Sequence, residues 1–349
     1  MSFLWGYRLF DFIKRCARAG VLGLLLSAKA FAAPENDPHY QPVKVVGDRE
    51  FLVRTQQGWG IAHYFGTGTL DGSTSAVRAL VNISGLLRNS DVYEKTGEKA
   101  IAAAGQAGDT LLVTPQFLAQ VDVTGHNLPA NTLRWKVLTW LDGTPALAPA
   151  PISAFAVLDD IVRRLEDRAR FPALREIVVM GHSAGGQLVQ RYAVVSGSAD
   201  ARVRFVVSNP SSYVYFTPDR PSSTEGCPRY NDWKYGFINP PPYVTIDAAA
   251  AESRYVTRRV TYLLGMLDVD PNHPVLDKSC MGEAEGPYRL ARGLAYAQYL
   301  RARHPAGTNQ DVAEVAGVDH DGDAMFASAC GAAVLFDRPR TVCAVNAKI

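Results

Sequence analysis

A serine between glycines is the first feature of this sequence that could do chemistry. Residues 177–186 read Ile-Val-Val-Met-Gly-His-Ser-Ala-Gly-Gly, which places Ser183 at the centre of a Gly-x-Ser-x-Gly motif. The apolar run before the motif predicts a buried strand, and the apolar residues of 187–195 recur at helical spacing after it. This order is typical of a nucleophile elbow, in which a strained serine is exposed on a sharp turn and a side chain at either glycine would collide with a neighbouring element. The alternative is a glycine-rich turn that arose by chance.

A serine hydroxyl becomes a nucleophile only when a base takes its proton, and the base needs an acid to orient it. Asp268 lies in the first loop positions after a predicted strand at residues 259–265. Asp270, before Pro271, is the alternative acid and would otherwise be a turn residue. Of the seven histidines, only His320 follows both the acid and the last predicted strand of the sheet. The order along the chain therefore predicts Ser183 as nucleophile, Asp268 as acid and His320 as base.

Acyl transfer also needs two backbone N–H groups that stabilise a developing oxyanion. One would come from Ala184, the residue after the nucleophile. The other would come from the loop after an earlier central strand, where Gly85 lets the backbone approach closely, so that the donor is Gly85 or Leu86. The alternative for this loop is a simple turn that ends a strand.

The elements that would position these residues alternate between strands and helices. Short β-like runs come first and predict an antiparallel meander at residues 43–46, 51–54 and 60–65. Further strands are predicted at residues 76–84, 109–114, 203–208, 259–265 and 311–318. Helices are predicted at residues 100–105, 152–168 (with Ser153 as N-cap), 187–195 and 288–303, and residues 135–140 suit an edge element. The alternation predicts an α/β fold with a doubly wound, mostly parallel sheet.

Residues 210–258 interrupt the alternation after the strand in the sixth position. They contain seven prolines and nine aromatic residues. A long insertion at the carboxyl end of a strand is where such folds build a lid or pocket wall, so Tyr213, Tyr215 and Trp233 are predicted to bind substrate. If the segment is extended, only one of the two alternating tyrosines can face the site. The alternative is an inert packed loop.

The elbow at residues 181–185, the Gly-x-x-Asp of residues 265–268 and the loop of His320 together resemble the α/β-hydrolase superfamily. The resemblance extends from about residue 77 to the C-terminus and implies the α/β-hydrolase fold. Members commonly carry His-Gly at the end of the oxyanion strand, where this chain has Ser84-Gly85, so the backbone donor is kept while the local sequence departs. Within the superfamily the chain looks most like extracellular esterases, lipases and polyester depolymerases, which implies an ester substrate, small or polymeric.

The N-terminus has the features of an export signal. Lys14, Arg15 and Arg18 precede an apolar run at residues 19–28, and Ala30-Phe31-Ala32 offers a small-x-small cleavage site. We therefore expect a signal peptide at residues 1–32, a loose leader at 33–42, a single domain at 43–349 and a periplasmic or extracellular location. The alternative is an uncleaved membrane anchor, although the apolar run is short for a span.

Charge and cysteine content agree with export. Without residues 1–32 the chain keeps 31 Lys+Arg and 33 Asp+Glu, with no charge run that would favour nucleic acid. Four cysteines remain, and an even number in an exported chain favours two disulfides, for which the pairs Cys227–Cys280 and Cys330–Cys343 are preferred over the other pairings or free thiols.

No cofactor or metal is expected, because the histidine and cysteine spacings match no zinc site and the chain lacks a phosphate-binding loop. The sequence thus predicts an exported serine hydrolase that cleaves a carboxylic ester. An amidase or peptidase with the same triad, and a binding protein that has lost activity, are the alternatives. Oligomeric state stays open.

Overall fold

The computed structural model describes residues 37–349 of the chain. The signal peptide expected at residues 1–32, and the first part of the leader, lie outside the described residues. The strands are β1 Arg49–Thr55, β2 Gly58–Gly66, β3 Arg78–Ile83, β4 Thr110–Gln116, β5 Glu176–His182, β6 Val203–Ser208, β7 Val260–Gly265, β8 Gln310–Val315 and β9 Val345–Lys348.

Helices connect most of these strands. They are α1 Ser90–Ala103, α2 Gln120–Gly125, α3 Ala154–Glu166, α4 Ala184–Val195, α5 Ala248–Tyr255, α6 Cys280–Glu283, α7 Arg289–Arg303, α8 Gly322–Ala327 and α9 Ala329–Leu335. Two short 3₁₀ helices lie at Pro38–Tyr40 and Trp140–Asp142.

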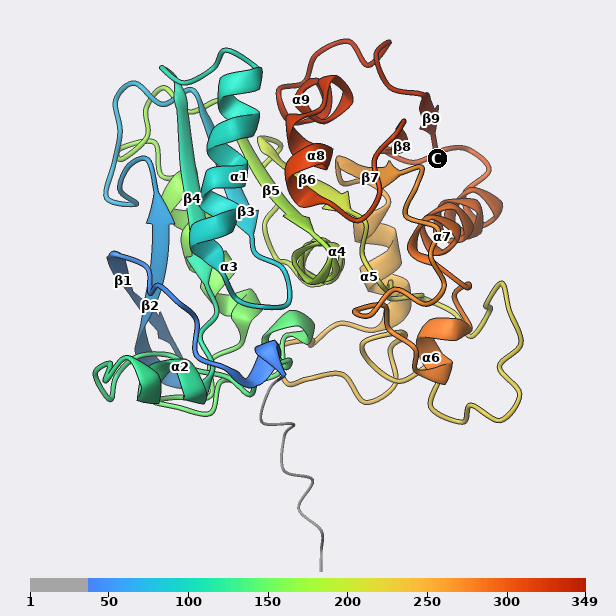
Figure 1. Ribbon diagram of the computed structural model, residues 1–349, viewed down its shortest axis with the longest axis horizontal. Helices are drawn as coiled ribbons and strands as arrows, with labels where there is room; N and C mark the ends of the chain where they lie inside the picture. The colour runs from blue at the N-terminus through green and yellow to red at the C-terminus, as the bar shows by residue number, and fades with distance from the viewer. Residues whose placement is uncertain (1–36) are drawn as a thin grey trace, which may run out of the picture. The chain divides into compact units, whose positions relative to one another are not determined.

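The described strands form one sheet in the order β1-β2-β4-β3-β5-β6-β7-β8-β9 (Figure 1). All pairs from β4 through β8 are parallel, whereas β1, β2 and β9 pair antiparallel at the two sides. The predicted doubly wound, mostly parallel sheet is therefore confirmed. Its parallel strands end at a common edge, and β5 runs directly into α4 near the centre of Figure 1.

The sheet is buried on both faces because its strands alternate apolar side chains between two cores. On β5, Ile177 and Val179 belong to the larger core, and Val178 and Met180 to the smaller one. The larger core includes residues of α3, α4, α5 and α7, and the smaller one residues of α1, α8 and α9. Figure 1 shows α1 and α8 in front of the strands, as this division requires.

The N-cap predicted for the helix at residues 152–168 is present in α3, since Ser153 Oγ accepts a hydrogen bond from the backbone N–H of Phe155 at 3.1 Å. Other local predictions were wrong. Residues 43–46 form no strand, because their neighbourhood is tied to side chains instead: Val43 N–H donates to Asp122 Oδ1 at 2.8 Å. Residues 135–140 form no edge element, because Trp135 and Trp140 are buried against Phe117.

Two disulfides join Cys227 to Cys280 and Cys330 to Cys343, which are the pairs preferred from the sequence. The first ties the segment after β6 to the start of α6, and the second ties α9 to the chain before β9. Within residues 37–349 no helix is both long and apolar enough to cross a membrane.

Candidate active site

Ser183 lies on the turn between β5 and α4, with φ of 60° and ψ of −120°. This positive φ is strained for a residue with a side chain. The flanking glycines make the turn feasible: a Cβ at Gly181 would lie 2.5 Å from the carbonyl carbon of Gly185, and a Cβ at Gly185 would overlap the carbonyl oxygen of Ile83. The motif therefore forms the elbow geometry for the steric reason expected of it.

The structure brings Ser183, His320 and Asp268 together from three different loops. His320 Nε2 lies 2.9 Å from Ser183 Oγ, and His320 Nδ1 lies 2.7 Å from Asp268 Oδ2. Because a carboxylate only accepts hydrogen bonds, Nδ1 carries the proton of the neutral ring and Nε2 is left to accept from the serine hydroxyl. This is the arrangement that lets an imidazole take a proton from a serine.

Asn209, at the carboxyl end of β6, hydrogen-bonds to the loop of Asp268 and to the loop of His320. Its side-chain oxygen accepts from Gly265 N–H at 2.9 Å, three residues before Asp268. Its side-chain nitrogen donates to the carbonyl oxygen of Asp319 at 3.2 Å, one residue before His320. Both loops are therefore fixed to a third, fully buried residue.

The imidazole of His320 lies in a crowded and poorly solvated place. Burial lowers the pKa of His320 below its ordinary value, and the positive charge of Arg289 lowers it further, against the opposing effect of Asp268. The ring of His182 lies 4.5 Å away and the ring of His273 5.0 Å away, centroid to centroid. A lowered pKa keeps the ring neutral, which is the form that accepts a proton.

The proposed oxyanion donors come from two segments that touch. The first turn of α4 packs against the loop after β3, since a Cβ at Gly185 would meet the carbonyl oxygens of Ile83 and Ser84. Ala184, the residue before Gly185, and Gly85 and Leu86, which follow Ser84, therefore belong to the two segments that meet here. A side chain at Gly85 would overlap the hydroxyl of Tyr93, so the loop needs glycine there.

Asp270 and the two tyrosines of the insertion take other places. Asp270 is exposed, and its carboxylate accepts from Asn272 N–H at 2.8 Å, which is a turn contact. Tyr213 and Tyr215 are both fully buried and pack on Tyr296 of α7. The expectation that one of the pair faces the site does not match these positions, because both rings are buried against Tyr296.

Trp233 is partly buried against the larger core. Its indole N–H donates to the carbonyl oxygen of Asp142 at 2.6 Å, and its ring meets Phe237 edge to face. The insertion reaches the candidate site instead through Ser211, whose hydroxyl accepts from the Arg289 Nε–H at 2.9 Å. Ser211, Arg289 and His273 were not predicted from the sequence to lie at the site. No local pattern marks a buried arginine at the start of a helix, and Ser211 and His273 meet at the site only through Arg289.

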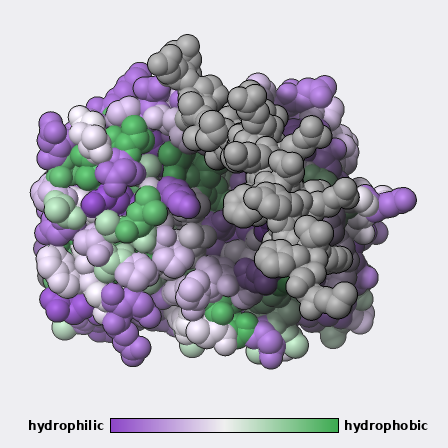
Figure 2. All heavy atoms as spheres, turned by 90° about the horizontal axis from the view of Figure 1, so that it is seen from below, coloured by the Kyte–Doolittle hydropathy of each residue, from purple (hydrophilic) through white to green (hydrophobic). Residues whose placement is uncertain are grey.

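Exposed apolar side chains accompany the two loops on either side of the candidate site. Leu87 follows Gly85 and Leu86, and Met266, Leu267 and Val269 surround Asp268 in sequence; all four are exposed. Figure 2, which views the molecule from below Figure 1, shows hydrophobic groups gathered in patches among hydrophilic ones where grey atoms do not cover them.

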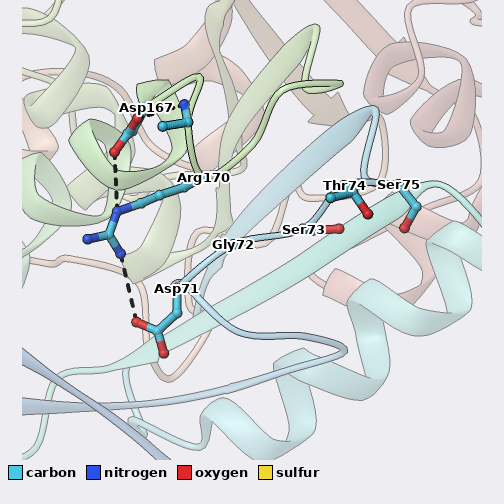
Figure 3. Close-up of a pocket in the computed structure, with 8 residues that line it drawn as sticks. Asp71, Gly72, Ser73, Thr74, Ser75, Asp167 and Arg170 are labelled. Atoms are coloured by element: carbon cyan, nitrogen blue, oxygen red, sulfur yellow. Dashed lines mark hydrogen bonds and ion pairs between the residues drawn. The ribbon is translucent and has the colours of Figure 1, made fainter.

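A surface cavity of about 860 Å³ lies elsewhere. It is lined by the segment before β3 and by the start of the α3–β5 connection. It therefore lies toward the amino end of β3, whereas Ser183 follows the carboxyl end of the neighbouring parallel strand β5. Figure 3 shows that Arg170 there lies between two carboxylates, with Asp167 at 3.2 Å and Asp71 at 3.9 Å. We assign no function to it. Within residues 37–349 no group of side chains is arranged to hold a metal ion.

The chain matches no family model, and a search of curated proteins finds no match. Its fold is similar to that of poly(aspartic acid) hydrolase-1 from Sphingomonas sp. KT-1, with a TM-score of 0.55, 24% identity and coverage of 82% of this chain and 96% of that one. It is also similar to LpqC, a poly(3-hydroxybutyrate) depolymerase from Bordetella parapertussis, with a TM-score of 0.58, 21% identity and coverage of 83% and 88%. With the strand order and the elbow, these similarities confirm the α/β-hydrolase fold.

Proposed function

We propose that this protein is an exported serine hydrolase that cleaves a carboxylic ester through an acyl-enzyme intermediate. The observation that carries the proposal is the hydrogen-bonded chain from Ser183 through His320 to Asp268, with distances of 2.9 and 2.7 Å. The nucleophile, the acid and the base follow successive strand ends along the chain, in the order typical of the α/β-hydrolase fold.

In acylation, Ser183 Oγ attacks the ester carbonyl carbon while its proton passes to His320 Nε2. The oxyanion that forms is held by Ala184 N–H and by a second N–H from Gly85 or Leu86. Collapse of the intermediate expels the alcohol, which takes the proton from His320. Water, activated by the same nitrogen, then hydrolyses the acyl-enzyme and releases the acid.

Asp268 supports this cycle by stabilising the imidazolium that forms and by holding the ring in one tautomer. It is chosen over Asp270 because it contacts Nδ1 of the ring, whereas Asp270 contacts a turn. The exposed apolar side chains beside the loops of Asp268 and Gly85 favour a substrate with an apolar acyl group.

Export is supported by the predicted signal peptide and by the two disulfides, which persist in an oxidising compartment. Residues 43–349 are proposed to act as one domain, with 210–258 as an insertion within it.

The direct test is labelling with a fluorophosphonate together with hydrolysis of p-nitrophenyl esters of graded chain length. The wild-type protein should be labelled and should turn over esters. Ser183→Ala should abolish labelling, and Ser183→Ala and His320→Ala should each lower kcat by a factor on the order of 10⁴ to 10⁶. His304→Ala is the matched control, because His304 pairs with Glu252 at the end of α7 and should not affect turnover.

The alternatives predict different results. A wild-type protein that binds esters but is neither labelled nor active would be a binding protein. Faster turnover of matched anilides than of esters would favour an amidase. Poly(3-hydroxybutyrate) and poly(aspartic acid), the polymers for which the two structural neighbours are named, belong in the substrate panel for this reason.

A further inference from the structure

Arg289, the first residue of α7, has a fully buried guanidinium that points its donors at three partners. Nε donates to Ser211 Oγ at 2.9 Å, Nη1 to Asp268 Oδ1 at 3.3 Å and Nη2 to His273 Nδ1 at 3.4 Å. Burying a charged group away from water is costly unless it is paired and hydrogen-bonded. A cation buried beside the proposed triad acid therefore invites a functional explanation.

The carboxylate of Asp268 is held from two directions. Oδ2 accepts from His320 Nδ1 at 2.7 Å, and Oδ1 accepts from Arg289 at 3.3 Å. With both oxygens engaged, the carboxylate is restricted to one rotamer and one plane. The orientation of His320 is thus set by Asp268, and that of Asp268 by Arg289.

The contact with His273 fixes a second imidazole. Arginine has only donors, so His273 Nδ1 must be an acceptor, and the proton of the neutral ring is on Nε2. The N–H of Val275 also donates to this nitrogen, at 3.4 Å. The ring of His273 then lies edge to face against that of His320.

We propose that Arg289 is a positioning residue for the proposed hydrolysis: its guanidinium, oriented by Ser211, fixes Asp268 behind His320 and His273 beside it. The inference rests on the proposed function, since it assigns a role around the same triad. Arg289 touches no reacting atom, and it acts through Asp268.

The charge of Arg289 also affects the base. The groups that face His320 are the carboxylate of Asp268, the guanidinium of Arg289 and the rings of His273 and His182. The pKa of His273 is itself lowered by burial and by Arg289, and raised by Asp268, Asp270 and Asp319. Because Arg289 lowers the pKa of His320, removing its charge should raise that pKa and move the acidic limb of the kcat/KM profile to higher pH.

Two substitutions separate charge from geometry. Arg289→Met removes both, and we expect kcat/KM to fall about 10- to 100-fold, with the acidic limb at higher pH than in the wild type. Arg289→Lys keeps the charge but lacks the planar fork that reaches three partners, so we expect kcat to fall while the limb stays in place. Arg204→Met is the matched control, because Arg204 is also buried and paired with a carboxylate, Glu176, but lies at the amino end of β6.

A third variant, Ser211→Ala, keeps the inference testable if Arg289→Met does not fold. Ser211→Ala removes only the hydroxyl that orients Arg289, and we expect a lower kcat with an unmoved acidic limb. Wild-type kcat in both Ser211→Ala and Arg289→Lys would overturn the inference, as would an unmoved limb in folded Arg289→Met. These results leave the proposed function intact, whereas an inactive, unlabelled wild-type protein would contradict the proposed function itself.

Discussion

At the scale of single residues, the candidate site depends on side chains that are unfavourable to place. Ser183 has a positive φ, and Arg289 carries a charge in the interior. Each is accommodated by specific neighbours: glycines relieve the turn, and Asp268 pairs with the arginine. Strain and buried charge of this kind are found where a structure fixes reacting groups.

The first residue-scale prediction separates the two candidate acids. Asp268→Asn should hold His320 in the wrong tautomer and lower kcat by a factor of about 10⁴. Asp270→Asn should leave kcat within about a factor of two or three, as a surface substitution would. Steady-state hydrolysis of a p-nitrophenyl ester measures both, and the reverse ranking would transfer the role to Asp270.

The second residue-scale prediction concerns the pH dependence of kcat/KM. Burial lowers the pKa of His320 below the ordinary imidazole value of 6.5, so the base stays neutral to lower pH than a free imidazole. The acidic limb of kcat/KM should accordingly have its midpoint below 6.5. A profile from pH 4 to 9 in buffers of constant ionic strength tests this, and a midpoint above the ordinary value would be contrary to it.

At the scale of elements, the ends of parallel strands bring the site together. Ser183 follows β5, Asp268 follows β7 and His320 follows β8. Asn209, at the end of β6, forms one hydrogen bond to the loop of Asp268 and another to the loop of His320. Four neighbouring strands, β5 to β8, thus each lead to one residue of the candidate site or its hydrogen-bonded surroundings. The insertion after β6 adds Ser211, which contacts the site through Arg289.

The two disulfides should differ in how much they stabilise the fold. In the chain-entropy view, closing the separation of 53 residues between Cys227 and Cys280 contributes about 4 kcal/mol, and closing the separation of 13 between Cys330 and Cys343 about 3 kcal/mol. Paired Cys→Ser variants unfolded in urea should therefore rank in this order. Equal or reversed losses would mean that native contacts, rather than loop closure, set their contribution.

The tyrosines of the insertion should affect stability before they affect specificity. Tyr213 is fully buried against Tyr296 and Tyr262, so Tyr213→Ala should cost about 3–5 kcal/mol in the free energy of unfolding. Among variants that fold, the ratio of kcat/KM for short and long acyl esters should not change. If Tyr213→Ala instead changed this ratio of kcat/KM values and left the free energy of unfolding unchanged, Tyr213 would line the substrate pocket.

At the scale of the whole molecule, the described chain forms one sheet with cores on both faces, and the proposed site lies at the edge where the parallel strands end. Ligands in open α/β sheets bind at this edge, outside the carboxyl ends of the strands. The cavity near Arg170 lies at the opposite ends of the strands and is occupied by its own ion pairs.

Export is the prediction at this scale. A bacterial periplasmic or culture fraction from cells that express the full chain should contain protein that begins at residue 33 and has no free thiol. Intact mass and alkylation without reductant measure both properties. An Ala32→Asp substitution should block cleavage, because the position before the cut needs a small residue. Full-length wild-type protein in the membrane fraction would instead favour the membrane anchor.

The sequence by itself determined the parallel part of the sheet and the three residues now proposed as the triad. A buried strand, a glycine-flanked serine and a following helix are local patterns, and the order of the later loops places Asp268 and His320 at strand ends without knowledge of any contact. The same locality explains the errors. The run at residues 43–46 suits a strand, but Val43 is tied to Asp122. The aromatic side chains of Trp135, Trp140, Tyr213 and Tyr215 suit an edge or a pocket wall, but all four are buried.

Only the tertiary structure decided what surrounds these residues. Arg289 lies 21 residues from Asp268 and 78 from Ser211 in sequence, and Asn209 lies 110 residues from Asp319. Contacts across such separations leave no periodicity in the chain. They depend on which strand ends and loops become neighbours once the sheet has formed. An arginine is predicted from sequence to be a surface residue, because arginines are rarely buried without a partner and the partner is not visible in the sequence.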